Sequence, residues 1–201
     1  MKFYLDTEFI ESGPSKPIQL ISLGMVCEDG REFYAISSEF NPEDASPWVK
    51  ENVLATLEPA TIVKRRSLHE IKMGMMDFIW NTSIHERPQF WGYYCDYDWV
   101  VFCQIFGNMM ALPKNFPMYC RDLKQWCDDL RNPDLPAQGK GEHNALTDAR
   151  WNKQAWEFLS KFERSKAFRA AYSIIHLGTL RNGIQVLGPD EIEKIITEEF
   201  S

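Results

Sequence analysis

The first forty residues alternate apolar and polar side chains in the manner of short β-strands. An opening strand is predicted over about residues 2–9, a largely apolar second strand over 18–27 and a third over 32–36. The Asp29-Gly30 pair between the second and third strands is a hairpin signal. We therefore expect the chain to open as a three-stranded antiparallel meander.

Beyond the meander, helix-start signals alternate with short strand signals. Three local patterns indicate N-terminal caps: Ser46 before Pro47, Ser67-x-x-Glu70 and Asp122-x-x-Gln125. Periodicity predicts helices at about 67–80, 96–107, 122–130 and from 144 toward 175, strands at 88–93 and 118–120, a turn at 182–183 and a last short helix from 189.

This order of elements predicts an α/β protein with a mixed sheet. The sheet combines the antiparallel three-strand meander with two further strands, and helices cover both faces. A chain of 201 residues is long enough for one such domain with a real core. We expect the domain to span residues 1–176 and residues 177–201 to form an extension that packs on it.

Composition narrows the setting in which the chain works. Five cysteines, with no Cys-x-x-Cys pair, argue against a disulfide framework and fit a reducing cytoplasm. No signal-peptide core or membrane span is apparent. The net charge of −7 argues against a protein that coats nucleic acid by neutralising its charge. An enzyme that binds a few terminal nucleotides, with metal ions as its local positive charge, stays compatible with that value.

The opening strand carries two acidic side chains, Asp6 and Glu8, which alternation places on one face. Two carboxylates that lie close together and partly buried repel each other, so either one keeps a proton or a cation neutralises both. The alternative is that the strand ends at Asp6 and that both acids are solvated, because short motifs often match by chance.

Three more polar residues occupy notable places. Asp98 lies in the first turn of an otherwise apolar helix, where Asp96 is better placed to act as the cap. Asp148 lies one turn into the long helix, and His143 precedes that helix. Five residues on a helix correspond to about 140° of rotation, so His143 and Asp148 would not bind one ion together. His143 instead suits a base that faces a water bound to a metal held by Asp148. A solvated first-turn acid and a structural histidine are the alternatives.

Taken in order, Asp6-x-Glu8, Tyr97-Asp98 and His143-x-x-x-x-Asp148 resemble the three motifs of the DEDDh 3′→5′ exonucleases. The closer resemblance is to a bacterial and phage subgroup of exoribonucleases, typified by a mycobacterial protein, and it covers about residues 1–160. The chain departs from the wider family at Phe9, where most members carry Thr, and at residues 91–94, where many carry an Asn. The shared segments are residues 6–11, 28–32, 97–98 with 103–104, and 143–150.

The resemblance implies a ribonuclease H-like fold and a site for two divalent ions. Oxygen-only ligands suit Mg²⁺ or Mn²⁺, and two ions roughly 3.5–4 Å apart support phosphodiester hydrolysis. Asp6 would bridge the ions, Glu8 and Asp148 would complete one shell, and Asp98 would act at the other through water. His143 would take the proton from the attacking water.

The resemblance also implies the reaction: removal of nucleoside 5′-monophosphates from the 3′ end of single-stranded RNA. Thr7, Phe9 and Ile10 are candidates for substrate contacts, and Phe9 and Ile10 could stack on terminal bases or belong to the core. Three alternatives stay open: an exodeoxyribonuclease, a hydrolase of short oligonucleotides with the same site, and a non-catalytic nucleic-acid-binding module. No membrane partner is expected, and a homodimer stays open.

Overall fold

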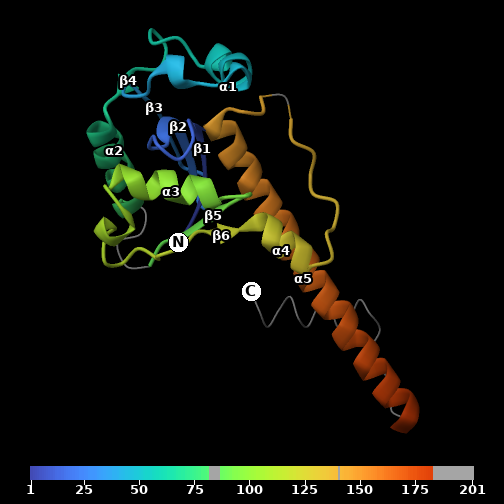
Figure 1. Ribbon diagram of the computed structural model, residues 1–201. Coiled ribbons are helices and arrows are strands. Elements are labelled where there is room, and N and C mark those ends of the chain that lie inside the picture. Colours follow the sequence, from blue (N-terminus) through green and yellow to red (C-terminus); the bar gives the residue numbers. More distant parts are fainter. Residues whose placement is uncertain (82–86, 140, 183–201) are drawn as a thin grey trace. The chain divides into compact units, whose positions relative to one another are not determined.

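The computed structural model describes residues 1–81, 87–139 and 141–182 (Figure 1). Side chains are described as far as residue 166. The chain divides into two compact units, Met1–Trp156 and Glu157–Ser201. The predicted boundary between residues 176 and 177 falls within the second unit and stays a prediction. The turn at 182–183 and the helix from 189 lie outside the described residues, at least in part.

The first unit is built on a six-stranded mixed sheet with strand order β4-β3-β2-β1-β5-β6. The strands β1, β2 and β3 form the predicted antiparallel meander, while β5 and β6 join it in parallel on the other side of β1. Their bounds are β1 (Lys2–Ile10), β2 (Gln19–Cys27), β3 (Glu32–Ser37), β4 (Arg65–Arg66), β5 (Gln89–Gly92) and β6 (Arg121–Asp122). The mixed sheet with helices agrees with the predicted ribonuclease H-like α/β class.

The helices begin where the sequence signals placed them. Ser46 and Asp122 accept hydrogen bonds from the backbone of α1 and α4, and Ser67 with Glu70 forms a complete capping box on α2. Their bounds are α1 (Pro47–Asn52), α2 (Leu68–Trp80), α3 (Asp96–Ile105), α4 (Leu123–Asp129) and α5 (Ala145–Asn182), with 3₁₀ turns η1 (Pro42–Asp44), η2 (Leu54–Thr56) and η3 (Met109–Ala111). None of the helices, in the part of the chain described, is long and apolar enough to cross a membrane.

Two expectations about the strands are wrong. Residues 118–120 are not a strand, because the parallel pairing with β5 begins only at Arg121, which lies opposite Trp91. A two-residue strand carries no periodicity, and the side chains of Met118 and Tyr119 are exposed. The sheet also has a sixth strand, β4, which pairs in parallel with the end of β3.

Alternation along β1 gives its two faces different tasks. Phe3 and Leu5 belong to the main core, which includes buried residues of α2 and α3. Tyr4 points to the opposite face, where its ring lies 6.0 Å from that of Trp156 in α5. Asp6 and Glu8 share the parity of Tyr4, so they face the first turns of α5, whereas Thr7 faces α3.

A glycine lets α5 approach the sheet closely. Gly24 in β2 lies opposite Asp6, and a Cβ added at Gly24 would lie only 2.1 Å from the carbonyl oxygen of Ala145. The backbone at the start of α5 therefore rests directly on the backbone of β2. Asp148 follows Ala145 by about one turn, so the contact between Ala145 and Gly24 sets how closely Asp148 approaches β1.

We predict that Gly24→Ala destabilises the fold and weakens divalent-ion binding. Overpacking typically costs about 1–3 kcal/mol, and here the added methyl group meets backbone atoms that cannot rotate away. Thermal unfolding and calorimetric Mn²⁺ titration measure the two effects. Gly139→Ala is the matched control, since a Cβ there would meet no atom within 4 Å. A Gly24→Ala protein with wild-type stability and Mn²⁺ affinity would contradict this account.

Candidate metal centre

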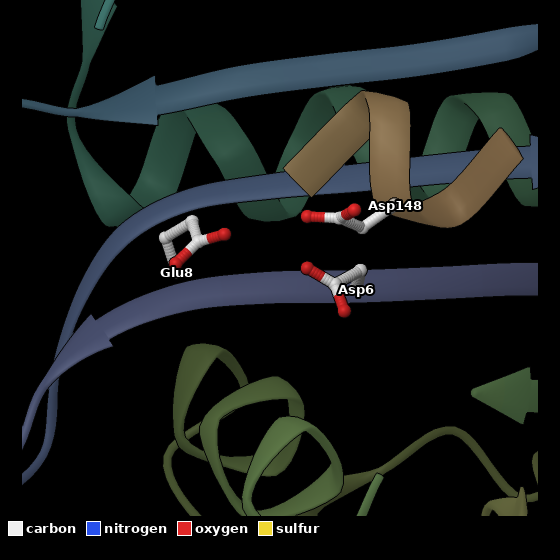
Figure 2. Close-up of side chains that lie close together, drawn as sticks. All are labelled: Asp6, Glu8 and Asp148. Carbon is white, nitrogen blue, oxygen red and sulfur yellow. The ribbon is translucent and has the colours of Figure 1, made fainter. Parts of the chain in front are cut away.

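Three carboxylates meet where β1 faces the start of α5. One oxygen from each of Asp6, Glu8 and Asp148 lies within 4.8 Å of the other two. Figure 2 shows the side chains of Asp6 and Glu8 on β1 and that of Asp148 on the helix above the strand. The sequence prediction that Asp6 and Glu8 share one face is therefore confirmed, and the fold adds Asp148 to them.

Asp98 reaches the same cavity from α3, on the other side of β1. The backbone N–H and the hydroxyl of Thr7 both donate to its Oδ1, at 2.7 and 2.6 Å. Thr7 is only 5% exposed. The polar groups of Thr7, which we expected to contact substrate, are thus engaged in orienting Asp98.

Asp96 does not cap α3, contrary to the sequence prediction. The N-cap residue is Cys95, whose side chain makes no capping hydrogen bond, and Asp96 is the exposed first residue of the helix. The backbone N–H of Cys95 instead donates to Asp122 in β6, at 2.8 Å. A carboxylate from the neighbouring strand therefore supports the start of the helix that carries Asp98.

Burial disfavours the charged forms of all four acids, and repulsion by neighbouring cluster acids adds to it at Asp6 and Glu8. The pKa of Asp6 is raised well above its ordinary value, first by burial and then by the charges of Asp98, Glu8 and Asp148. Burial, with Asp148 and Asp98, raises the pKa of Glu8 to about 8. Burial also raises the pKa of Asp98 to about 6 against the lowering effect of Thr7, and it raises that of Asp148.

These donors fit a hard divalent cation. The three clustered groups offer only carboxylate oxygens, the ligands that Mg²⁺ and Mn²⁺ prefer over zinc. No lysine or arginine lines the cavity among the residues that the structure describes. A bound cation would therefore relieve a repulsion that no lysine or arginine around the described cavity offsets.

His143 precedes α5 at the rim of this cavity. Its backbone N–H donates to Oδ2 of Asp148 at 2.9 Å, which lowers the pKa of that acid and partly opposes the effect of burial. Its ring meets Trp48 edge-on, with ring centroids 4.7 Å apart. His143 and Asp148 thus line the same cavity, while the role of His143 as a base stays a prediction.

The cavity holds about 320 Å³ and contains several residues that the sequence prediction missed. Trp151 and Asn152 follow Asp148 by three and four residues, a spacing that places them on the same face of α5 and could have identified them. Tyr93 and Tyr94 follow β5 and no motif signalled them, whereas Tyr97 in α3 belongs to the Tyr97-Asp98 motif but was given no role in the site. The missed residues are Tyr93, Tyr94, Tyr97, Gln138, Trp151 and Asn152.

The two apolar candidates for substrate contact differ in their surroundings. Phe9 lines the cavity and stacks on Tyr97, with ring centroids 5.6 Å apart and planes 8° from parallel. Ile10 is 1% exposed and packs with Ile21, Ala45 and Val53. The core alternative therefore describes Ile10, whereas Phe9 packs against the main core and also lines the cavity, so its contact with a base stays a prediction.

The fold and the site together define an α/β protein with a partly buried carboxylate centre on a central strand of a ribonuclease H-like sheet. The sequence matches the family described as 3′-5′ exoribonuclease Rv2179c-like domain over residues 1–160. It is also 41% identical over 150 residues to 3′-5′ exoribonuclease Rv2179c of Mycobacterium tuberculosis strain H37Rv, which covers 75% of this chain and 88% of the relative.

A second relative, 3′-5′ exoribonuclease MT2234.1 of M. tuberculosis strain CDC 1551, matches with the same identity of 41% and the same coverage. The chain therefore belongs to the 3′-5′ exoribonuclease Rv2179c-like family. The resemblance to the bacterial exoribonuclease subgroup, drawn from the motifs, is confirmed.

The raised pKa of Glu8 predicts how the stability of the metal-free protein depends on pH. Its pKa rises from the ordinary value of 4.5 to about 8 in the fold, so the native state binds the proton more tightly than the unfolded chain. The resulting stabilisation is fully present below about pH 4.5 and is lost as the pH rises through about 8.

In EDTA, the unfolding temperature of the wild type should therefore fall as the pH rises from about 5 to 9. The unfolding temperature of Glu8→Gln should fall less steeply over the same range. Circular dichroism during heating measures both, and Mg²⁺ should restore stability to the wild type at the alkaline end. Glu51→Gln, at an exposed carboxyl group of α1, is the control. Equal slopes for Glu8→Gln and the wild type would contradict the assignment of Glu8 to a buried, repelled cluster.

Proposed function

We propose that this protein is a metal-dependent 3′→5′ exoribonuclease that releases nucleoside 5′-monophosphates from single-stranded RNA. The observation that carries the proposal is the meeting of Asp6, Glu8 and Asp148 in one cavity with His143 at its rim. Membership of an exoribonuclease family supports the choice of RNA and of the 3′ end.

Asp6, Glu8, Asp98 and Asp148 would hold Mg²⁺ or Mn²⁺. When bound, such ions stabilise the charge that develops on the attacking and leaving oxygens of a phosphodiester displacement. Thr7 fixes the orientation of Asp98 through two hydrogen bonds to one oxygen. Two close contacts, of Gly24 with Ala145 and of the His143 N–H with Asp148, fix the start of α5.

His143 acts as the general base in this proposal. It takes a proton from the attacking water, whose oxygen forms a bond to the phosphorus of the last phosphodiester. The bond from phosphorus to the 3′ oxygen of the preceding nucleotide breaks. The freed 3′ oxygen takes up a proton from solvent, which gives the shortened strand a 3′ hydroxyl, and the released nucleotide keeps the phosphate on its 5′ oxygen.

The size and lining of the cavity favour action on a strand end. A volume of about 320 Å³ suits one nucleotide better than a length of strand, since drug-sized ligand sites usually span about 300–1,000 Å³. Phe9, Tyr94 and Tyr97 offer aromatic surface on which a base can stack, a contact worth about 1–3 kcal/mol per base. Stacking lets a chain of net charge −7 bind RNA with few phosphate contacts.

The proposal predicts stepwise shortening of RNA from its 3′ end in Mg²⁺ or Mn²⁺ and none in EDTA. RNA and DNA of equal sequence, labelled at the 5′ end, show the ladder and the sugar preference, and chromatography identifies the 5′-monophosphates. A 3′-terminal phosphate should block the reaction, because a further dianion would lie beside the carboxylates. Cleavage of circular RNA would overturn the exonuclease assignment. Binding without any cleavage would favour a non-catalytic module.

Asn substitutions at Asp98 and Asp96 test the assignment within α3. Asp98→Asn should lower the rate at least about 10–100-fold. Replacing a residue that only supports a metal's ligands typically costs that much, and Asp98 is proposed to act at a metal itself. Asp96→Asn is the matched control and should leave the rate unchanged, because Asp96 is exposed and does not line the cavity. Rates are compared in single-turnover assays at saturating Mn²⁺. The reverse pattern would show that the wrong acid of α3 has been assigned.

A further inference from the structure

His143 has a backbone conformation that needs support. Its φ of 67° lies in the left-handed region, which residues other than glycine seldom adopt. Gly141, two residues earlier, also has a positive φ, of 110°. Such conformations persist where surrounding contacts over-determine them, and they cluster at functional sites.

One such contact comes from α1. The indole of Trp48 meets the imidazole of His143 edge-on, with planes 80° apart and centroids 4.7 Å apart. Trp48 is 54% exposed and does not belong to the described lining of the cavity. Its contact with the site therefore passes through His143.

A second contact holds the next residue. The side-chain amide of Asn144 donates to the hydroxyl of Tyr34 at 3.4 Å and to Oε1 of Glu58 at 3.3 Å. Tyr34 in turn donates to Oε2 of Glu58 at 2.9 Å. The other end of the Asn144 side chain accepts from the backbone N–H of Thr147 at 3.1 Å. Asn144 thus ties the start of α5 to Glu58.

Trp48 and Glu58 belong to the same connection, residues 38–64, between β3 and β4. No residue of α1 is buried, but Val49 packs against the small core cluster that holds Ala45 and Val53, so the connection is anchored on the sheet. The ring contact of Trp48 holds His143, and the hydrogen bonds of Glu58 hold Asn144 beside it.

We infer that the connection 38–64 is a clamp that positions His143 for catalysis. Trp48 is a positioning residue that packs against the imidazole ring, and Glu58 fixes the backbone beside it through Asn144. The inference rests on the proposed function, in which His143 is the base. Loss of the clamp slows proton transfer while the carboxylates still bind metal and the cavity still binds RNA.

A double-mutant cycle tests this inference in the full-length protein. Single-turnover rates on RNA at saturating Mn²⁺ are measured for the wild type, Trp48→Ala, His143→Ala and the double variant. Trp48→Ala should slow the reaction about 10–100-fold, because misplacing a catalytic group by about 1 Å can cost 10²-fold. His143→Ala should lose about 10²–10⁴-fold. The double variant should be no slower than His143→Ala, because both changes act on the same function, proton transfer by His143.

Three further variants sharpen the cycle. Trp48→Phe keeps an aromatic edge and should retain most of the rate, and Glu58→Ala should be slow only while His143 is present. Trp80→Ala, a change at a 43% exposed tryptophan of α2, is the control and should leave the rate unchanged. Calorimetric Mn²⁺ affinity should be equal for the wild type, Trp48→Ala and Glu58→Ala.

Two kinetic results would overturn the clamp. The first is a wild-type rate in Trp48→Ala. The second is that Trp48→Ala lowers the rate by the same factor in His143→Ala as in the wild type. The second result, with weaker RNA binding, would mean that Trp48 stacks on a base instead. NMR of the imidazole protons tests the contact without activity, and Trp48→Ala should shift them by removing the ring current. An inactive wild type with that shift would refute the proposed function alone, whereas an unchanged spectrum would refute the clamp.

Discussion

The repulsion among carboxylates held together in a partly buried cluster is the constraint on which this structure depends. Asp6, Glu8 and Asp148 lie within 4.8 Å of one another, and burial raises the pKa of each. Such a cluster persists only where the backbone leaves its members no room to separate. Gly24 provides that condition, because its missing side chain lets the first turn of α5 rest on β2. A bound cation would offset the repulsion that this arrangement creates among the carboxylates.

The central strand serves packing and chemistry by the same alternation. Phe3 and Leu5 anchor β1 in the main core, and Asp6 and Glu8, further along the strand, lie on the other face. Thr7 connects the two sides, since it extends toward α3 and holds Asp98 with two hydrogen bonds. These hydrogen bonds orient Asp98 within the site. His143, in contrast, is contacted by the exposed ring of Trp48.

Local patterns predicted the elements that local physics determines. The period of two in β1 placed Asp6 and Glu8 on one face, and the caps at Ser46, Ser67 and Asp122 marked three helix starts. Contacts between distant segments left no such signal. The support of α3 by Asp122 joins residues 27 positions apart, and the two-residue strand β6 has no periodicity to detect. The ring contact of Trp48 with His143 also depends on tertiary packing that no motif encodes.

Calorimetric titration of Mn²⁺ into the metal-free protein, for the wild type and Asp6→Asn, tests the central claim most directly. Asn keeps the size of Asp6 but removes the charge that the cluster shares with a cation. The account predicts saturable binding to the wild type and its loss in Asp6→Asn, with circular dichroism showing the same fold in both. Equal Mn²⁺ binding by the two proteins would contradict the assignment of this cluster as the metal centre.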